Sequence, residues 1–252
     1  MTTVLKLGGS VITDKTRRET LDGEALNAAA DAIATAYGSG VDRLVVVHGG
    51  GSFGHPHAED HGVSTTGGTT DAAAVLEIHG AMKTLNRFVL VRLHERDVPA
   101  LPVHSLSAGC RDEGGTLTHP FGQVRTMLGE GFVPVLHGDV VAHAGAGATV
   151  VSGDELVVAA AEEVDADRVG LCSTVPGVLD ESGEVIDHIE SFAEAEATLG
   201  DSEATDVSGG MAGKVRTLLS LSVPANVFGA DDLAAFLDGE SPGTLVGTGE
   251  SR

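Results

Sequence analysis

Residues 3–10 read TVLKLGGS, an apolar run that carries one lysine and closes on two glycines. The run predicts a buried strand over residues 3–7 that Gly8 and Gly9 end. Glycines at a strand end let backbone N–H groups approach a phosphate closely, and Lys6 adds a positive charge. Alone the motif is weak, because strand-end glycines are common turn residues. Its significance depends on the glycine segments farther along the chain.

The rest of the chain alternates between strand and helix patterns. We expect further strands at residues 44–47, 99–103, 132–136, 149–151, 168–172 and 225–228, and helices at residues 21–37, 71–94, 121–128, 152–161, 209–221 and 231–237. This alternation predicts an α/β fold of three layers, α/β/α, with a central and mostly parallel sheet. We expect a single domain over residues 1–252, with residues 145–147 as the candidate junction between two lobes.

Composition excludes several classes of function. The formal net charge of -22 disfavours nucleic acid and anionic membranes as partners. No apolar run approaches the roughly 20 residues that span a bilayer, and the N-terminus lacks a signal-peptide layout. Cys110 and Cys172 are far apart, which argues against a disulfide framework. We therefore expect a cytoplasmic protein.

The acidic surface also suggests adaptation to a salt-rich cytoplasm, although an ordinary acidic protein would have the same sign of charge. Aromatic residues make up 3% of the chain, and small side chains are abundant. At molar salt the Debye length is about 3 Å, so self-repulsion is screened. Under this hypothesis the purified protein loses structure at low salt, and a melting temperature that is flat across the salt range would refute it.

Lysine is rare in this sequence, and its positions are informative. The chain has Lys6, Lys15, Lys83 and Lys214, and three of them lie in or near glycine-rich segments. A lysine ammonium is a compact charge suited to a phosphate oxygen. The alternative is that these lysines survived by chance.

Residues 48–55, HGGGSFGH, admit two interpretations. Gly49, Gly51 and Gly54 fit the G-x-G-x-x-G fingerprint, and Asp71 comes 17 residues after Gly54, as in a nicotinamide-dependent oxidoreductase. That enzyme class has no use for the lysine and glycine segments elsewhere in the chain. The closely spaced histidines also suggest a metal site, but the glycines break any common helical face, so we expect no metal and an exposed His57 and His61.

Two later segments point to anion binding. Residues 206–214, DVSGGMAGK, resemble a Walker A loop but have Ser208 and Val215 where that motif needs glycine and Ser/Thr. Glycines before a helix with Lys214 in its first turns still form an anion site. Ser152-Gly153-Asp154 stands at another strand-to-helix transition, where Asp154 taken alone is most simply an N-cap.

In their order, these segments resemble the amino-acid-kinase family over essentially the whole chain, and residues 51–55 resemble its isopentenyl phosphate kinases. Fosfomycin kinases have a similar histidine, whereas relatives acting on acetylglutamate, glutamate, aspartate or UMP usually lack it. The resemblance implies an ATP-dependent kinase that converts isopentenyl phosphate to isopentenyl diphosphate, a homodimer, an acceptor lobe at about 1–147 and a nucleotide lobe at about 148–252. Kinases of UMP, fosfomycin or acyl amino acids, and a non-catalytic nucleotide sensor, are the alternatives.

The resemblance also implies roles for individual residues. Lys6 and Lys214 would hold the ATP phosphates, Lys15 would stabilise the transferring phosphoryl group, His55 would bind the acceptor phosphate, and Asp154 would orient the lysines. Nucleotide contacts would come from Gly8, Gly9, Ser10, Gly51, Thr174 and Gly210, and acceptor contacts from Gly50 and Gly153. Mg²⁺ would arrive with ATP rather than in a dedicated cage.

One departure and one open choice remain. The family usually has an acidic Asp-x-Asp-Gly turn where this chain has residues 174–177, TVPG, so the base preference is less certain than the phosphate contacts. An isoprenoid tail would need an apolar pocket, and the stripe at Ala74, Val75, Ile78, His79 and Met82 could form a wall of it. From periodicity alone, that stripe is more simply part of the core.

Overall fold

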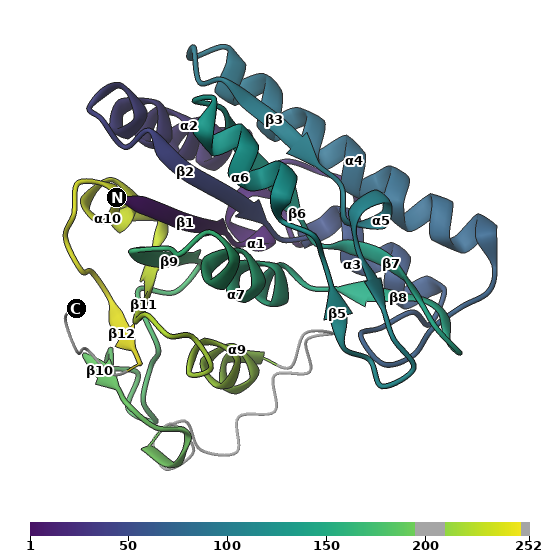
Figure 1. The fold of residues 1–252 in the computed structure, drawn as a ribbon. Helices are drawn as coiled ribbons and strands as arrows, with labels where there is room; N and C mark the ends of the chain where they lie inside the picture. Colours follow the sequence, from purple (N-terminus) through teal and green to yellow (C-terminus); the bar gives the residue numbers. More distant parts are fainter. Residues whose placement is uncertain (195–209, 248–252) are drawn as a thin grey trace.

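The fold is built around one large sheet. The computed structural model describes residues 1–194 and 210–247. In these residues an eight-stranded sheet has the order β10-β12-β11-β9-β1-β2-β6-β3, and all of its neighbouring pairs are parallel except β11 with β12 (Figure 1). Its strands are β1 Thr2–Leu7, β2 Arg43–His48, β3 Ala100–Val103, β6 Val133–His137, β9 Arg168–Ser173, β10 His188–Ile189, β11 Ala225–Gly229 and β12 Thr244–Val246.

Helices cover both faces of this sheet, so the predicted three-layer α/β/α architecture is confirmed. Alternate residues of β1 show the division, because Val4 packs in the core under α6, α7 and α9 while Leu5 packs under α2, α4 and α10. The helices are α1 Gly9–Ile12, α2 Gly23–Gly38, α3 Gly51–Asp60, α4 Ala72–His94, α5 Ser105–Ala108, α6 Gly122–Gly129, α7 Gly153–Glu163, α9 Gly210–Leu218 and α10 Leu233–Leu237.

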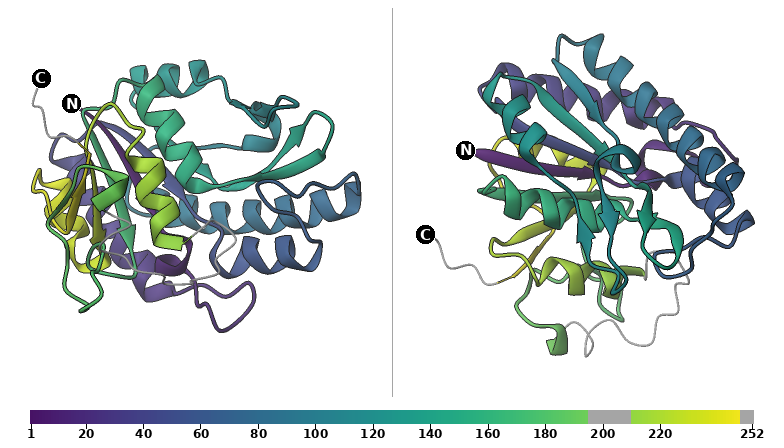
Figure 2. Two further views of the ribbon diagram at one scale, coloured as in Figure 1. Left: turned by 90° about the horizontal axis from the view of Figure 1, so that it is seen from below. Right: turned by 45° about the vertical axis from the view of Figure 1, so that its right-hand side comes forward.

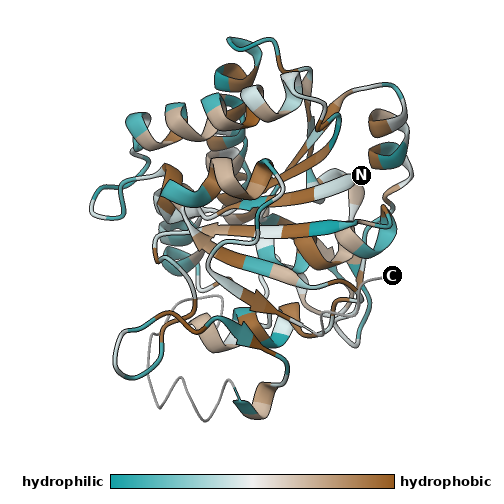
Figure 3. Cartoon of the chain, turned by 90° about the vertical axis from the view of Figure 1, so that its left-hand side faces the viewer, coloured by the Kyte–Doolittle hydropathy of each residue, from teal (hydrophilic) through white to brown (hydrophobic). Residues whose placement is uncertain are grey.

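Hydrophobic residues gather on the strands of the sheet, whereas hydrophilic residues dominate the surrounding loops (Figure 3). The central strands are buried along their length, with every residue of β1 buried. A parallel sheet covered on both faces requires such near-continuous burial. Within residues 1–194 and 210–247, no helix combines the length and the apolarity needed to cross a bilayer.

A second, four-stranded sheet was not predicted. Its order is β5-β4-β7-β8, and its strands are β4 Cys110–Arg111, β5 Leu117–Thr118, β7 Asp139–His143 and β8 Gly147–Val151. Gly138 alone separates β6 from β7, so the sequence pattern reads as one strand. Of residues 145–147, the first two lie in the turn between β7 and β8, and Gly147 begins β8. The central sheet contains strands from both sides of this expected junction, since β1 pairs with β2, which precedes residue 145, and with β9, which follows residue 147.

Helix α3 was also missed, and its sequence explains why. It contains Gly51, Gly54 and Pro56, all poor helix formers. Pro56 has no N–H to donate to the carbonyl of Ser52, but the Glu19 N–H donates to that oxygen at 2.9 Å. Tertiary packing completes the stabilisation, because α3 lies along α4 (Figure 2).

Candidate active site

The glycine segments converge at the carboxyl ends of neighbouring parallel strands, where ligands bind in open α/β sheets. Gly9 lies just after β1 and Gly49 just after β2, and the two turns touch backbone to backbone. A Cβ on Gly9 would lie 2.2 Å from the Gly51 nitrogen, and one on Gly49 would lie 2.7 Å from the Gly9 nitrogen. Gly51 itself has φ +48°. The glycines are therefore required by the packing of the turns against each other.

A cleft of about 980 Å³, counting space open to solvent, lies at these turns. It is lined by nearly all of the predicted site residues: Lys6, Gly8, Gly9, Ser10, Lys15, Gly50, His55, Gly153, Asp154, Thr174 and Lys214. Gly51 does not line it and is buried against Gly9 and Thr13, and Gly210 begins α9, where the described residues resume. The structure thus gathers residues from both halves of the chain at one place.

Lys6 and Asp154 form a buried ion pair on the cleft floor. Lys6 Nζ donates to Asp154 Oδ1 at 2.5 Å, and their side chains are 8% and 9% exposed. Gly153 leaves space for the lysine, since a Cβ there would lie 3.2 Å from Lys6 Cε. At this burial the attraction is far stronger than in water.

The simple interpretation of Asp154 as an N-cap is wrong. The cap of α7 is Ser152, whose hydroxyl accepts from the Glu155 N–H at 3.1 Å while the Glu155 carboxylate accepts from the Ser152 N–H at 2.8 Å. This capping box satisfies the helix end. Asp154 is therefore available to hold Lys6.

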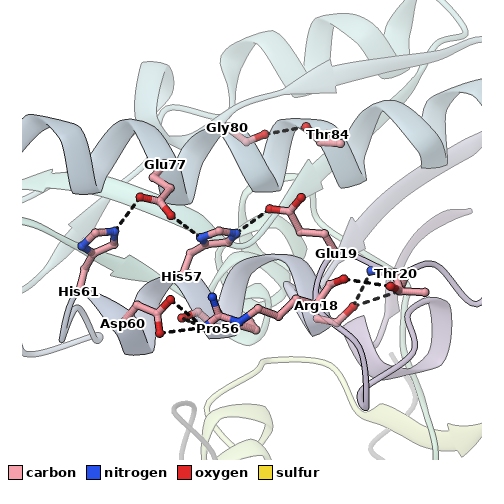
Figure 4. Close-up of polar contacts among 11 residues, drawn as sticks. Arg18, Glu19, Thr20, Pro56, His57, Asp60, His61, Glu77, Gly80 and Thr84 are labelled. Carbon is pink, nitrogen blue, oxygen red and sulfur yellow. Dashed lines mark hydrogen bonds and ion pairs between the residues drawn. The ribbon is translucent and has the colours of Figure 1, made fainter.

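Lys15 lines the cleft from the loop after α1. Polar contacts of this loop with α3, and of α3 with α4, are shown in Figure 4. His57 lies between two carboxylates, with Nε2 2.6 Å from Glu19 Oε1 and Nδ1 2.8 Å from Glu77 Oε1. Arg18 donates to Asp60 at 2.7 Å. These contacts tie the loop after α1 to α3 and, through His57, to α4.

The same contacts correct the expectation for one histidine. The His57 side chain is only 12% exposed and is not a free surface group, whereas His61 is exposed and contacts Glu77 at 3.0 Å. Within the described ranges, no group of three or more His, Cys, Asp or Glu side chains is placed to hold a metal ion. Asp154, the acidic residue predicted for the site, is paired with Lys6.

Lys214 lines the cleft from α9, but the start of its motif, residues 206–209, lies outside the described residues. Two longer helices also begin at the cleft, with Gly50 at the N-cap of α3 and Gly153 at the first position of α7. Helix N-termini carry partial positive charge. The cleft therefore concentrates positive charge in a protein of net charge -22.

One end of the cleft is apolar. Ala58, Ile78, Met82 and Val150 line it beside Gly50 and His55. Gly54 makes room for this wall, because a Cβ there would lie 2.5 Å from Met82 Sδ. Part of the stripe on α4 thus borders the cleft rather than serving the core alone.

The comparisons with known proteins agree with this geometry. The model of the amino acid kinase family matches residues 1–225. The chain belongs to the amino acid kinase family. It is 62% identical over 243 residues to the isopentenyl phosphate kinase of Haloferax volcanii, covering 96% of this chain and 97% of that one. It is 30% identical over 259 residues to the enzyme of that name from Methanocaldococcus jannaschii, covering 98% of each.

Solved structures give the same family fold. A crystal structure of an isopentenyl phosphate kinase superposes with a TM-score of 0.83 at 29% identity, covering 97% of this chain and 99% of that chain. The product complex of the Thermoplasma acidophilum isopentenyl phosphate kinase superposes with a TM-score of 0.75 at 22% identity, covering 97% and 99%. The oxidoreductase alternative is thereby excluded, since the glycine fingerprint belongs to a kinase fold.

Sequence reasoning missed a buried acidic residue of the cleft. Asp139 lines the cleft with a buried side chain, and its Oδ2 lies 2.8 Å from His79 Nδ1. A signal was present in the sequence, because His137-Gly138 repeats the His48-Gly49 pattern at the end of a strand.

Proposed function

We propose that this chain is an ATP-dependent kinase that phosphorylates isopentenyl phosphate to isopentenyl diphosphate. The observation that carries the proposal is the cleft itself, in which Lys6, Lys15 and Lys214 lie next to an apolar end formed by Ile78 and Met82. A phosphate group with a short hydrocarbon tail is the acceptor that matches both parts. The relatives bearing that enzyme name support the choice.

The chemistry needs positioning more than proton transfer. A phosphate monoester has a second pKa of about 6, so its oxygens are already anionic at neutral pH and no general base is required. The task is to hold two anions in line and to neutralise charge as the phosphoryl group moves. Ammonium groups and backbone N–H donors at a cleft can do both.

The three lysines of the cleft have two roles in the proposed reaction. Lys6 and Lys214 hold the phosphates of ATP, and Lys15 stabilises the phosphoryl group in transit. Asp154 keeps the Lys6 ammonium at a fixed position, which the 2.5 Å ion pair supports. Mg²⁺ bound to ATP would supply further positive charge at the phosphates, beside Lys6 and Lys214. Gly8, Gly9, Ser10, Gly51, Thr174 and Gly210 remain the proposed nucleotide contacts.

The acceptor lies at the His55 end of the cleft. His55 and the turns at Gly50 and Gly153 bind its phosphate, and its tail contacts Ile78 and Met82. Burial of a five-carbon tail at about 0.8 kcal/mol per CH₂ contributes modestly and discriminates poorly between isomers with shifted double bonds. Dimethylallyl phosphate should therefore also be accepted.

A substrate panel tests the proposal. The purified chain is assayed for ATP consumption with isopentenyl phosphate, UMP, acetylglutamate and fosfomycin, each at the same concentration. We expect turnover with isopentenyl phosphate to exceed that with the others. A preference for any other acceptor would overturn the assignment of the tail-binding end, and the absence of turnover with all of them would favour a nucleotide sensor.

The proposal also covers the lobes of the chain, its assembly and its location. The acceptor lobe comprises about residues 1–147 and the nucleotide lobe about residues 148–252, with a homodimer as the assembly and the cytoplasm as the location. Because residues 174–177 lack the acidic turn usual in the family, GTP should be assayed beside ATP.

A further inference from the structure

Two buried histidines lie beneath the glycine turns of the cleft, and the proposed reaction gives neither of them a role. His48 ends β2 and His137 ends β6, and each is followed directly by a glycine. The strand register places the two residues side by side. Their rings stack with centroids 5.4 Å apart and planes inclined by 24°. Both side chains are fully buried.

The hydrogen bonds of His48 determine its tautomer. Its Nδ1 is 3.1 Å from the Gly49 carbonyl oxygen, which can only accept, so Nδ1 carries the proton. Its Nε2 is 3.1 Å from Asn86 Nδ2, an amide that donates to the unprotonated nitrogen. Burial lowers the pKa of His48 to about 4, which keeps the ring neutral as this pattern requires.

His137 repeats the arrangement one strand away. Its Nδ1 is 2.8 Å from the Gly138 carbonyl oxygen, and its Nε2 is 2.8 Å from His104 Nδ1. Burial lowers the pKa of His137 to about 3. The Gly138 N–H donates to the His48 carbonyl at 3.0 Å, which joins the two turns. Each ring therefore holds the carbonyl of its own following glycine.

We propose that His48 is a positioning residue for phosphoryl transfer, which fixes the Gly49–Gly50 peptide so that the Gly50 N–H serves as a hydrogen-bond donor to the acceptor phosphate. A trans peptide is planar and directs its carbonyl and its N–H to opposite sides. The Gly49 carbonyl points to the buried imidazole, and Gly50 lines the cleft. The identity of the bound anion rests on the proposed function.

The turn needs such a device because glycine provides little restraint of its own. A peptide flanked by glycines has few intrinsic restraints on its dihedral angles, since neither residue has a Cβ. A donor that must reorient when the phosphate arrives contributes less to the transition state than one held in advance. The imidazole removes that freedom from inside the protein, without contacting the substrate.

The chain offers a matched pair of variants. Asparagine places an amide near the Nδ1 position and can still donate to Gly49, whereas glutamine reaches the Nε2 position and cannot. We expect His48→Gln to lower kcat by about tenfold, the equivalent of one hydrogen bond, with a smaller change in the KM for ATP. His48→Asn should restore most of kcat.

A third variant tests whether the loss of any hydrogen bond from a histidine side chain to a backbone carbonyl lowers kcat. His94 Nε2 contacts the Ala100 carbonyl at 2.6 Å and does not line the cleft. His94→Asn removes that donor and should leave kcat near the wild-type value. Equal kcat in the two His48 variants, or an equal deficit in His94→Asn, would overturn the proposal.

An amide titration separates this role from folding and from the choice of substrate. Inorganic phosphate is added to each ¹⁵N-labelled protein while the Gly50 amide resonance is followed, with melting temperatures measured in parallel. We expect a downfield shift in the wild type and in His48→Asn that is lost in His48→Gln, although all three are folded. An unchanged shift in His48→Gln would refute the role. If the wild type has no kinase activity, the proposed function fails, but this titration still decides whether His48 positions Gly50.

Discussion

Lys6 and Lys15 line the same cleft, but the protein holds them in opposite ways. Lys6 projects from the central strand β1 and is paired with Asp154 where both side chains are nearly buried. Lys15 stands in a loop whose restraints are at the rim, where Glu19 and Glu77 are each 50% exposed.

The comparison shows that burial determines how firmly a charged side chain is held. The floor of the cleft is the buried Lys6–Asp154 pair, and the rim is the pair of exposed carboxylates of Glu19 and Glu77. A buried charge pair is held by the low dielectric around it, whereas an exposed pair competes with water and salt. The floor should therefore be rigid and insensitive to salt, and removal of one partner there should be costly. The rim can shift at little cost, which suits a loop that must admit a substrate.

The largest expected effect comes from breaking the floor pair. Lys6→Met should lower kcat by about 10²–10³-fold, the scale of one lost electrostatic donor. It should also destabilise the fold by about 3–5 kcal/mol, because the Asp154 carboxylate is left buried and unpaired. Steady-state kinetics and urea unfolding measure the two effects.

A double variant separates stability from catalysis. Lys6→Met with Asp154→Asn removes the unpaired charge and should recover much of the stability while kcat stays low. Recovery of turnover in the double variant would show that Lys6 acts only in folding.

His55 lies between floor and rim, being half-buried at the apolar end of the cleft. His55→Ala should lower kcat/KM for isopentenyl phosphate by about tenfold to a hundredfold, the range of one lost hydrogen bond to a charged group. The KM for ATP should change less, because the residue is placed at the acceptor end. Initial rates with each substrate varied in turn test this, and an acceptor KM and kcat equal to the wild type would remove His55 from the site.

The buried histidines make the floor sensitive to acid. Desolvation lowers the pKa of His48 to about 4 and that of His137 to about 3, against about 6.5 in an unfolded chain. Between these values the unfolded chain binds protons that the fold excludes, so stability is complete above about pH 6.5 and falls as the pH is lowered toward 4. The loss should be on the order of a few kcal/mol over this window.

Urea unfolding at pH 7 and pH 5.5 measures this dependence while most carboxylates stay ionised. His48→Asn removes one titrating group and should reduce the pH dependence. An identical dependence in the wild type and the variant would assign it to other residues.

The smallest effect is expected at the rim. Glu19→Ala removes one carboxylate from His57 and should lower kcat by less than about fivefold, because exposed pairs contribute about 0.2–1 kcal/mol. The deficit should shrink as salt is raised. Glu95 is a matched control, since it is 56% exposed and pairs with Arg92 at 3.4 Å on the surface of the helix. A deficit in Glu95→Ala as large as that in Glu19→Ala would show a general charge effect.

Sequence patterns predicted those strands and helices that are specified by residues close together in the chain. The strand at residues 3–7 and the helix at residues 71–94 were placed to within a residue or so, because burial and helical spacing are read over a few neighbours. Helix α3 was missed because Pro56 and its glycines oppose a helix until α4 and Glu19 support it. The cap of α7 was misplaced because Asp154 and Ser152 are both good capping residues.

By itself, the sequence determined the α/β class, the family resemblance and the lysine and glycine residues that form much of the cleft lining. Only the tertiary structure decided that Asp154 holds Lys6, that Ile78 and Met82 line the same cleft as the glycine turns, and that His48 stacks on His137. Spacing along a chain encodes which face of an element a residue occupies. The register between strands and helices far apart in the sequence decides which of those faces meet.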